Sequence, residues 1–225
     1  ETTGTLIIKK QLDGTAPDAG LFSFTLKRTS APEGAEVFTD RTASNTAAGS
    51  VYFGTITYKK AGTYIYTVEE NDTTGCFLDS RTVTITQAVE DDGTNKLAVT
   101  STAYVWNDGS TENGRATFYN YSKRQIELKA EKTLIGAALT DGAFTFTADC
   151  ISKPAGAASI PAQTKTNAGQ NITFNNIDVT MLGDYVFEVK ETAGSTSGMT
   201  CSKVVYTVTV TVEQASADTE PTITY

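Results

Sequence analysis

The chain has 225 residues, of which 39% are hydrophobic, and its formal net charge is −8. This acidic balance without Lys/Arg clusters argues against a nucleic-acid partner, and no apolar stretch approaches the roughly 20 residues that span a membrane. The sequence contains no histidine, which excludes Ser-His-Asp and Cys-His nucleophilic sites and histidine-containing zinc sites, and we expect neither a metal nor a cofactor.

Taken from the N-terminus, the first half of the sequence is a series of short strand-like runs. In most of them threonine alternates with valine, isoleucine or an aromatic residue, which is typical of half-buried β-strands. Clusters of Gly, Asp and Asn separate the runs, and no segment has the pattern of an amphipathic helix. Many short strands with frequent turns predict an all-β sandwich. The runs lie at residues 5–12, 21–28, 51–58, 63–70, 81–89, 96–106 and 116–121.

The second half of the sequence repeats the first at an offset of 121 or 122 residues. A repeat of this length indicates two homologous units. We therefore expect two tandem sandwiches, at residues 1–122 and 123–225. The four matched pairs are KQLDG (10–14) with KTLIG (132–136), AGLFSFTL (19–26) with DGAFTFTA (141–148), FGTI (53–56) with FNNI (174–177), and AGTYIYTVEE (61–70) with LGDYVFEVKE (182–191).

Three polar residues of the first repeat stand in phase with apolar residues on their predicted strands. They are Lys10, Glu70 and Asn120, whereas Lys9 and Glu69 are out of phase because side chains alternate between the two faces of a strand. A lysine or glutamate buried alone costs several kcal/mol. The apolar residues on the same faces are Leu6, Ile8 and Leu12; Tyr64, Tyr66 and Val68; and Ala116 and Phe118.

Three interpretations of these polar residues compete. They lie at strand ends and reach water, or Lys10 and Glu70 form a buried ion pair with Asn120 as a hydrogen-bond partner, or the lysine reacts with the asparagine. The reaction needs an uncharged lysine and a protonated carboxyl group, and apolar burial favours both. The carboxyl group would then shuttle protons while the amine displaces ammonia from the carboxamide.

The motifs K-x-L-x-G, Y-x-Y-x-V-x-E and FYNY, in this order, resemble the isopeptide-linkage domains of Gram-positive pilins and surface adhesins, the streptococcal major-pilin type above all. The resemblance covers nearly the whole chain as two tandem copies. It implies an immunoglobulin-like sandwich whose first and last strands are neighbours. It also implies that Lys10 is the nucleophile, Glu70 the acid–base group and Asn120 the electrophile of a Lys–Asn cross-link.

The second repeat supplies Lys132 and Glu191 as the corresponding pair but no clear asparagine. The offset places the counterpart of Asn120 beyond Tyr225. The final PTITY corresponds either to KLAVT (96–100) or to TFYN (117–120), and the second alternative would put Tyr225 at the asparagine position. Asn175 and Asn176 match an internal strand edge and are weak candidates. The apolar residues predicted to share one strand face with Lys132 are Ile126, Leu128, Ala130 and Leu134.

From this pattern we expect the second sandwich to lack its last strand. Its open sheet edge would accept a donated β-strand, and a strand that carries an asparagine would couple covalently to Lys132. Cys150 and Cys201 either pair or stay as thiols. Asp91, Asp92 and Asn95 form either a polar hairpin turn or, less favoured, a calcium site.

The resemblance implies a structural role, as a shaft or stalk segment of an extracellular, cell-wall-anchored pilus or adhesin, with neighbouring pilin or adhesin domains as partners. The cross-link would form once, so no enzymatic turnover is expected. Neither an LPxTG-like motif nor a lysine in AYVWNDGS (103–110) is present, which weakens a shaft-pilin role. The alternative is an adhesin that binds a host protein or glycan through its loops, at residues 30–50 or 152–170. The carboxylates of Glu69 and Glu70 do not suit glycosidase chemistry, because adjacent strand residues face opposite sides.

Overall fold

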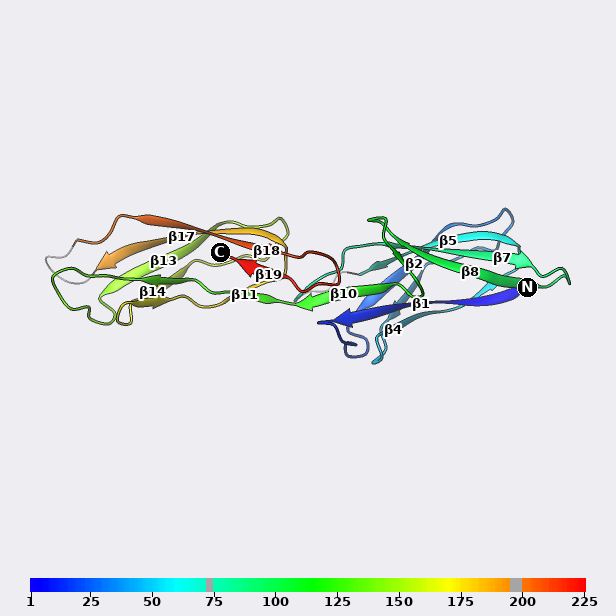
Figure 1. The fold of residues 1–225 in the computed structure, drawn as a ribbon, viewed down its shortest axis with the longest axis horizontal. Helices are drawn as coiled ribbons and strands as arrows, with labels where there is room; N and C mark the ends of the chain where they lie inside the picture. Colours follow the sequence, from blue (N-terminus) through cyan, green and yellow to red (C-terminus); the bar gives the residue numbers. More distant parts are fainter. Residues whose placement is uncertain (72–74, 195–199) are drawn as a thin grey trace. The chain divides into compact units, whose positions relative to one another are not determined.

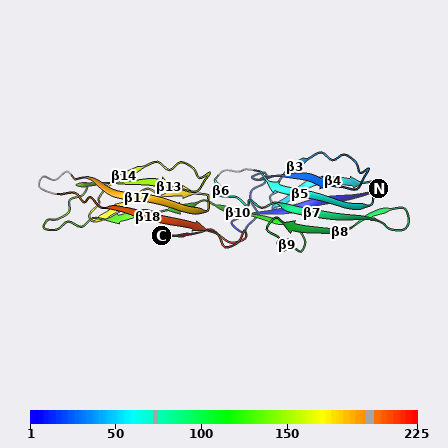
Figure 2. The same ribbon diagram turned by 90° about the horizontal axis from the view of Figure 1, so that it is seen from above.

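The computed structural model describes residues 1–71, 75–194 and 200–225, which divide into two compact units, Glu1–Tyr121 and Ser122–Tyr225 (Figure 1; Figure 2). All the regular elements in these residues are β-strands, so the prediction of an all-β chain is confirmed. Across the described ranges, no helix has the length and apolar character needed to cross a membrane.

The strands of unit 1 are β1 (Thr2–Leu12), β2 (Ser23–Ser30), β3 (Arg41–Ser44), β4 (Ser50–Tyr58), β5 (Gly62–Glu70), β6 (Cys76–Phe77), β7 (Val83–Asp91), β8 (Leu97–Trp106), β9 (Thr111–Glu112) and β10 (Thr117–Ser122). One sheet has six strands in the order β3-β2-β5-β7-β8-β9, and the other has four in the order β4-β1-β10-β6. In the four-stranded sheet β1 lies between β4 and β10, antiparallel to the first and parallel to the second (Figure 1). The first and last strands of unit 1 are therefore direct neighbours.

The core of unit 1 is filled by alternate side chains from both sheets. Leu6, Ile8 and Lys10 of β1 are buried, and Lys9 is exposed, as the period of a strand requires. Phe118 of β10 packs edge-on against Phe24 of β2, with ring centroids 5.1 Å apart. Lys10 therefore belongs to the same buried stripe as its aliphatic neighbours.

A tight turn at Gly49 holds the backbone of Lys10. The Gly49 carbonyl accepts a hydrogen bond from the Lys10 N–H at 2.7 Å, and Gly49 has φ +71°. A Cβ at this position would lie 2.5 Å from the Lys10 carbonyl oxygen. We expect Gly49→Ala to lower the free energy of unfolding by about 2–4 kcal/mol, because a clash with backbone adds to left-handed strain. Urea unfolding followed by the fluorescence of Trp106 measures this loss.

Gly14→Ala is the matched control for this substitution. Gly14 has φ +75°, but nothing lies within 4 Å of the Cβ that alanine would add. Only the conformational strain of about 1–2 kcal/mol is expected there. Equal losses in the two variants would show that Gly49 does not make the close approach to Lys10 described above.

The strands of unit 2 are β11 (Arg124–Ile126), β12 (Lys129–Glu131), β13 (Phe144–Ser152), β14 (Gln163–Thr166), β15 (Asn171–Thr173), β16 (Ile177–Val179), β17 (Gly183–Gly194), β18 (Val205–Glu213) and β19 (Thr222–Thr224). One sheet has five strands in the order β14-β13-β17-β18-β19. The remaining strands form two antiparallel pairs, β11 with β16 and β12 with β15. The two pairs together take the place that β1 and β4 occupy in unit 1.

The prediction of one continuous strand from Ile126 to Leu134 is wrong. The strand is divided into β11 and β12, and Lys132 and Leu134 lie beyond its end. The division faces the gap between β15 and β16, which contains Asn175 and Asn176. The corresponding place in unit 1 also has an irregularity, a register shift in β1 opposite the segment around Gly54, where φ is +78°. Unit 2 turns this bulge into a complete break in pairing.

The strand β19 resolves the two alignments of the C-terminal PTITY. It pairs antiparallel with β18, with Glu213 opposite Thr222. The end of β7 pairs with the start of β8 in the same way, with Glu90, the counterpart of Glu213, opposite Ala98. PTITY therefore occupies the place of the segment that contains KLAVT, and Tyr225 does not occupy the asparagine position. Among the described residues of unit 2, no strand pairs in parallel with β11 or β12 as β10 does with β1.

Candidate functional site

Unit 1 brings Lys10, Glu70 and Asn120 together from the three strands β1, β5 and β10. Lys10 and Asn120 are each 1% exposed, and the side chain of Glu70 is 2% exposed. Lys10 Nζ lies 2.9 Å from Glu70 Oε2, and Asn120 Nδ2 donates to Glu70 Oε1 at 2.9 Å. One carboxyl group therefore bridges the amine and the carboxamide, and the interpretation in which these residues reach water at strand ends is wrong.

Burial beside aromatic rings shifts the proton equilibrium of the Lys10–Glu70 pair. Lys10 Nζ lies 4.6 Å from the ring centroid of Phe22. Burial lowers the pKa of the Lys10 amine and raises the pKa of the Glu70 carboxyl group, and in both groups it outweighs their mutual attraction. The ion pair and the uncharged pair contain the same number of protons. A single proton transfer along the 2.9 Å hydrogen bond therefore yields an uncharged amine beside a protonated acid.

Two further residues, Asp79 and Cys76, contact the Asn120 carboxamide, and no sequence pattern singles them out. The backbone N–H of Asp79 donates to Asn120 Oδ1 at 2.8 Å. Asn120 Nδ2 also lies 3.8 Å from the sulfur of Cys76, and burial raises the pKa of that thiol. Asp79 precedes β7 in an irregular segment, where no residue period indicates which backbone groups face the core.

The charged neighbours of Lys10 and Glu70 lie on the outer face of their strands. Glu69 pairs with Lys27 in a partly exposed ion pair, and Lys9 is exposed. The strand period therefore separates Lys10 and Glu70 each from a more accessible neighbour of the same charge.

Unit 2 reproduces the lysine–glutamate pair. Lys132 Nζ lies 2.8 Å from Glu191 Oε2 and 4.5 Å from the ring centroid of Phe144, the counterpart of Phe22. The carboxyl group of Glu191 differs from that of Glu70 in the contacts of its second oxygen. Glu191 Oε1 is buried without a hydrogen-bond partner among the described residues, whereas Glu70 Oε1 accepts from Asn120. Among the described residues of unit 2, the lysine–glutamate pair is therefore present, and no asparagine carboxamide contacts it.

The pair of unit 2 borders a cavity of about 280 Å³, whose lining includes Lys132, Glu191 and Tyr206. Tyr206 occupies the place of Val83, because Val189 pairs with Tyr206 as Val68 pairs with Val83. Tyr206 is 64% exposed, whereas Val83 is fully buried. The core of unit 2 is therefore accessible beside Lys132, at a place where unit 1 is closed.

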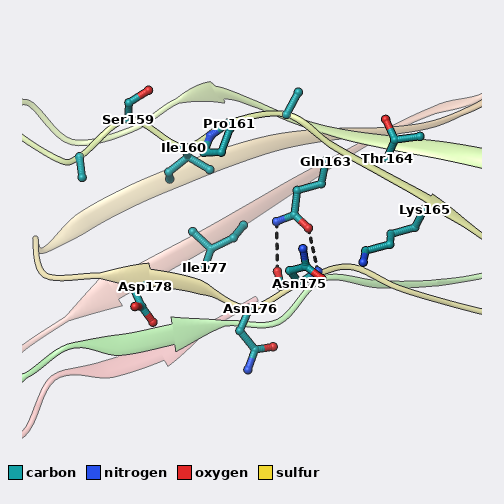
Figure 3. A pocket seen from close by; sticks show the side chains of 12 residues that line it. Ser159, Ile160, Pro161, Gln163, Thr164, Lys165, Asn175, Asn176, Ile177 and Asp178 are labelled. Carbon is teal, nitrogen blue, oxygen red and sulfur yellow. Dashed lines mark hydrogen bonds between the residues drawn. The ribbon is translucent and has the colours of Figure 1, made fainter.

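Asn175 and Asn176 lie in another cavity, of about 580 Å³ (Figure 3). The Asn175 N–H donates to Gln163 Oε1 at 2.7 Å, and Gln163 Nε2 donates back to the Asn175 carbonyl at 3.1 Å. Asn176 Nδ2 donates to Gln125 Oε1 at 2.9 Å. Neither asparagine lines the cavity beside Lys132. The rim of this cavity includes residues 158–165, part of the loop that the sequence suggested for ligand binding.

Two open questions from the sequence have structural answers. Asp92 Oδ1 accepts hydrogen bonds from the backbone N–H groups of Thr94 and Lys96, so the segment 91–96 is a polar turn. No group of three His, Cys, Asp or Glu side chains that could hold a metal ion occurs in the ranges that the structure covers. Cys150 Sγ donates to the Ser152 carbonyl at 3.4 Å, and no disulfide joins Cys150 to Cys201.

The chain matches a family model in both of its units. The family model FctA, described as a Spy0128-like isopeptide containing domain, matches the chain twice, at residues 6–122 and 128–225. None of the curated proteins compared matches the chain.

Similar solved structures come from pilus proteins. The major pilin of Streptococcus pyogenes is 16% identical over 84% of this chain and 82% of its own, with a TM-score of 0.38. The T-13 major pilin of the same organism is 21% identical over 86% and 83%, with a TM-score of 0.36. A C-terminal fragment of the pilus adhesin SpaC from Lactobacillus rhamnosus GG is 14% identical over 95% and 93%, also with a TM-score of 0.36.

Proposed function

The chain belongs to the FctA family of Spy0128-like isopeptide-containing domains, and we propose that it is a structural segment of a Gram-positive pilus or surface adhesin stabilised by an autocatalytic Lys10–Asn120 bond. The observation that carries the proposal is the single buried carboxyl group of Glu70, which contacts both the Lys10 amine and the Asn120 carboxamide at 2.9 Å. An amine, a proton shuttle and an amide with a leaving group are the three parts that the reaction needs.

The proposed reaction is a transamidation within unit 1. The uncharged amine of Lys10 attacks Cγ of Asn120, and the carbonyl electron pair moves to Oδ1. Glu70 transfers its proton to Nδ2 and accepts one from Nζ, so the acid is regenerated. The bond between Cγ and Nδ2 breaks, ammonia leaves, and a secondary amide joins the two side chains.

The position of this bond suits a load-bearing role. Lys10 and Asn120 lie on neighbouring strands, through which the chain enters and leaves unit 1. A pulling force would pass from β1 through the amide to β10, and the residues between 10 and 120 would carry none of it. The proposed setting is accordingly extracellular, on a cell-wall-attached assembly, with neighbouring pilin or adhesin domains as partners. The bond forms once per chain, so the protein would have no turnover.

The intact mass of the purified chain tests this proposal. We expect a mass about 17 Da below the sequence mass, because one ammonia is lost, and a peptide map in which the segments that contain Lys10 and Asn120 are joined. A full sequence mass in folded protein would leave a buried ion pair and contradict the proposed bond. A deficit of about 34 Da would reveal a second bond, in unit 2.

A second proposed role concerns unit 2, which would accept a donated β-strand. The observation that favours it is the buried Glu191 Oε1 without a hydrogen-bond partner among the described residues. An asparagine on an added strand would supply this oxygen with the amide donor that Asn120 provides in unit 1. Binding of a host ligand at the cavity of residues 158–165 is the remaining alternative, and the observation in its favour is the volume of that cavity, about 580 Å³.

A further inference from the structure

The carbonyl oxygen of Asn120 is held by a backbone donor from outside the three reacting residues. We propose that the backbone N–H of Asp79 is the oxyanion donor of the cross-linking reaction, an inference that rests on the proposed function of this site. The N–H lies 2.8 Å from Asn120 Oδ1, within the hydrogen-bonding range. Oδ1 is the atom that gains negative charge when the lysine attacks.

A hydrogen-bond donor at Asn120 Oδ1 increases the rate of the cross-linking reaction. The tetrahedral intermediate carries an oxyanion where the planar carboxamide carries only a partial charge, so the hydrogen bond strengthens as the reaction proceeds. Asp79 and Asn120 are both buried, and the low local dielectric increases the strength of this hydrogen bond. Because the donor already lies in place, little reorganisation is required at the moment of attack.

Reciprocal contacts fix the segment that carries this donor against β10. The Asp79 N–H donates to the side chain of Asn120, and the Asp79 carboxylate accepts from the backbone N–H of Tyr119 at 3.0 Å. Arg81 donates to the same carboxylate, through Nε at 2.9 Å and Nη2 at 2.7 Å. Arg81 in turn lies 3.9 Å from the ring of Trp106. The guanidinium neutralises the buried carboxylate, so the donor is not placed beside an unbalanced negative charge.

Unit 2 contains the equivalent donor with a different acceptor. Tyr206 corresponds to Val83 by strand pairing, so the residue four positions earlier, Ser202, corresponds to Asp79. The Ser202 N–H donates to Glu191 Oε2 at 3.2 Å. The same backbone group thus faces the reaction site in both units, and it contacts a carboxamide oxygen in the unit that has one.

Replacing a single backbone atom tests the inference. Cell-free translation with a suppressor tRNA can place the α-hydroxy analogue of aspartate at position 79, which exchanges the N–H for an ester oxygen and keeps the side chain. After synthesis is stopped, the approach of the intact mass to the value 17 Da lower is followed in time. We expect the ester chain to react on the order of 100-fold more slowly than the all-amide chain.

An ester at Phe144 is the matched control. The backbone N–H of Phe144 also donates to an asparagine oxygen, Asn167 Oδ1, at 2.9 Å in a buried place of unit 2. The control chain therefore loses a hydrogen bond of the same type, and the reacting residues of unit 1 keep all of their contacts. Equal rates for the two esters would overturn the inference and leave the cross-link intact. A lack of ammonia loss in the all-amide chain would instead contradict the proposed function itself.

Discussion

Lys10→Met will abolish the loss of ammonia and lower the melting temperature of unit 1 by roughly 15–20 °C. Methionine keeps a long, flexible apolar side chain in the core but cannot attack Asn120. The bond closes a loop of roughly 110 residues, and the disulfide analogy gives about 4–5 kcal/mol of stabilisation for a loop of this length. For a domain of this size, each kcal/mol lost lowers the melting temperature by about 4 °C, so losing the bond gives the fall stated above.

The ion pair itself contributes little to this difference. Burial already raises the pKa of the Glu70 carboxyl group, so in the variant Glu70 can remain protonated and avoid a buried unpaired charge. Calorimetry and intact mass are measured on the same sample. Lys27→Met is the control, because it removes a partly exposed lysine that pairs with Glu69. This control should keep the mass deficit and melt close to the temperature of the parent chain, because a surface ion pair contributes little to stability. A Lys10→Met chain that still lacks 17 Da would assign the bond to another lysine.

A synthetic peptide with the sequence of residues 115–122, RATFYNYS, should couple covalently to Lys132. The adduct is expected to add the mass of the peptide less about 17 Da, since one ammonia leaves for each bond formed. The reacting pair is already in place, with Lys132 Nζ 2.8 Å from Glu191 Oε2. The accessible cavity beside it is lined by Tyr206 and other residues that a strand would cover.

The pairing in unit 1 sets the register of the added strand. Leu12 pairs with Asn120, so the peptide asparagine should lie opposite Leu134, two residues beyond Lys132. A peptide in which alanine replaces this asparagine is the matched control and should form no adduct. Lys132→Met in the chain should also prevent coupling. Absence of an adduct, while protease resistance shows that unit 2 is folded, would refute the strand-acceptor role.

Much of the site could be predicted from the sequence because it lies on strands. The two-residue period places Lys10 and Glu70 among apolar side chains, and the same period excludes Lys9 and Glu69. Asp79 could not be found in this way, because its contribution is a backbone N–H in an irregular segment. The division of the strand before Lys132 was also missed, because it depends on a break in pairing at Asn175 and Asn176 on the neighbouring strand. Side-chain periodicity carries no information about either feature.

The site draws on both layers of the unit 1 sandwich. Lys10 and Asn120 belong to the four-stranded sheet, whereas Glu70 belongs to the six-stranded sheet. Under the proposed chemistry, the amine and the amide cannot react until the two layers have packed and the carboxyl group has arrived between them. The departure of ammonia then makes the step irreversible in dilute solution. The bond would thus act as a folding checkpoint, and each cross-linked chain would carry a permanent chemical record that its sandwich had once been correctly assembled.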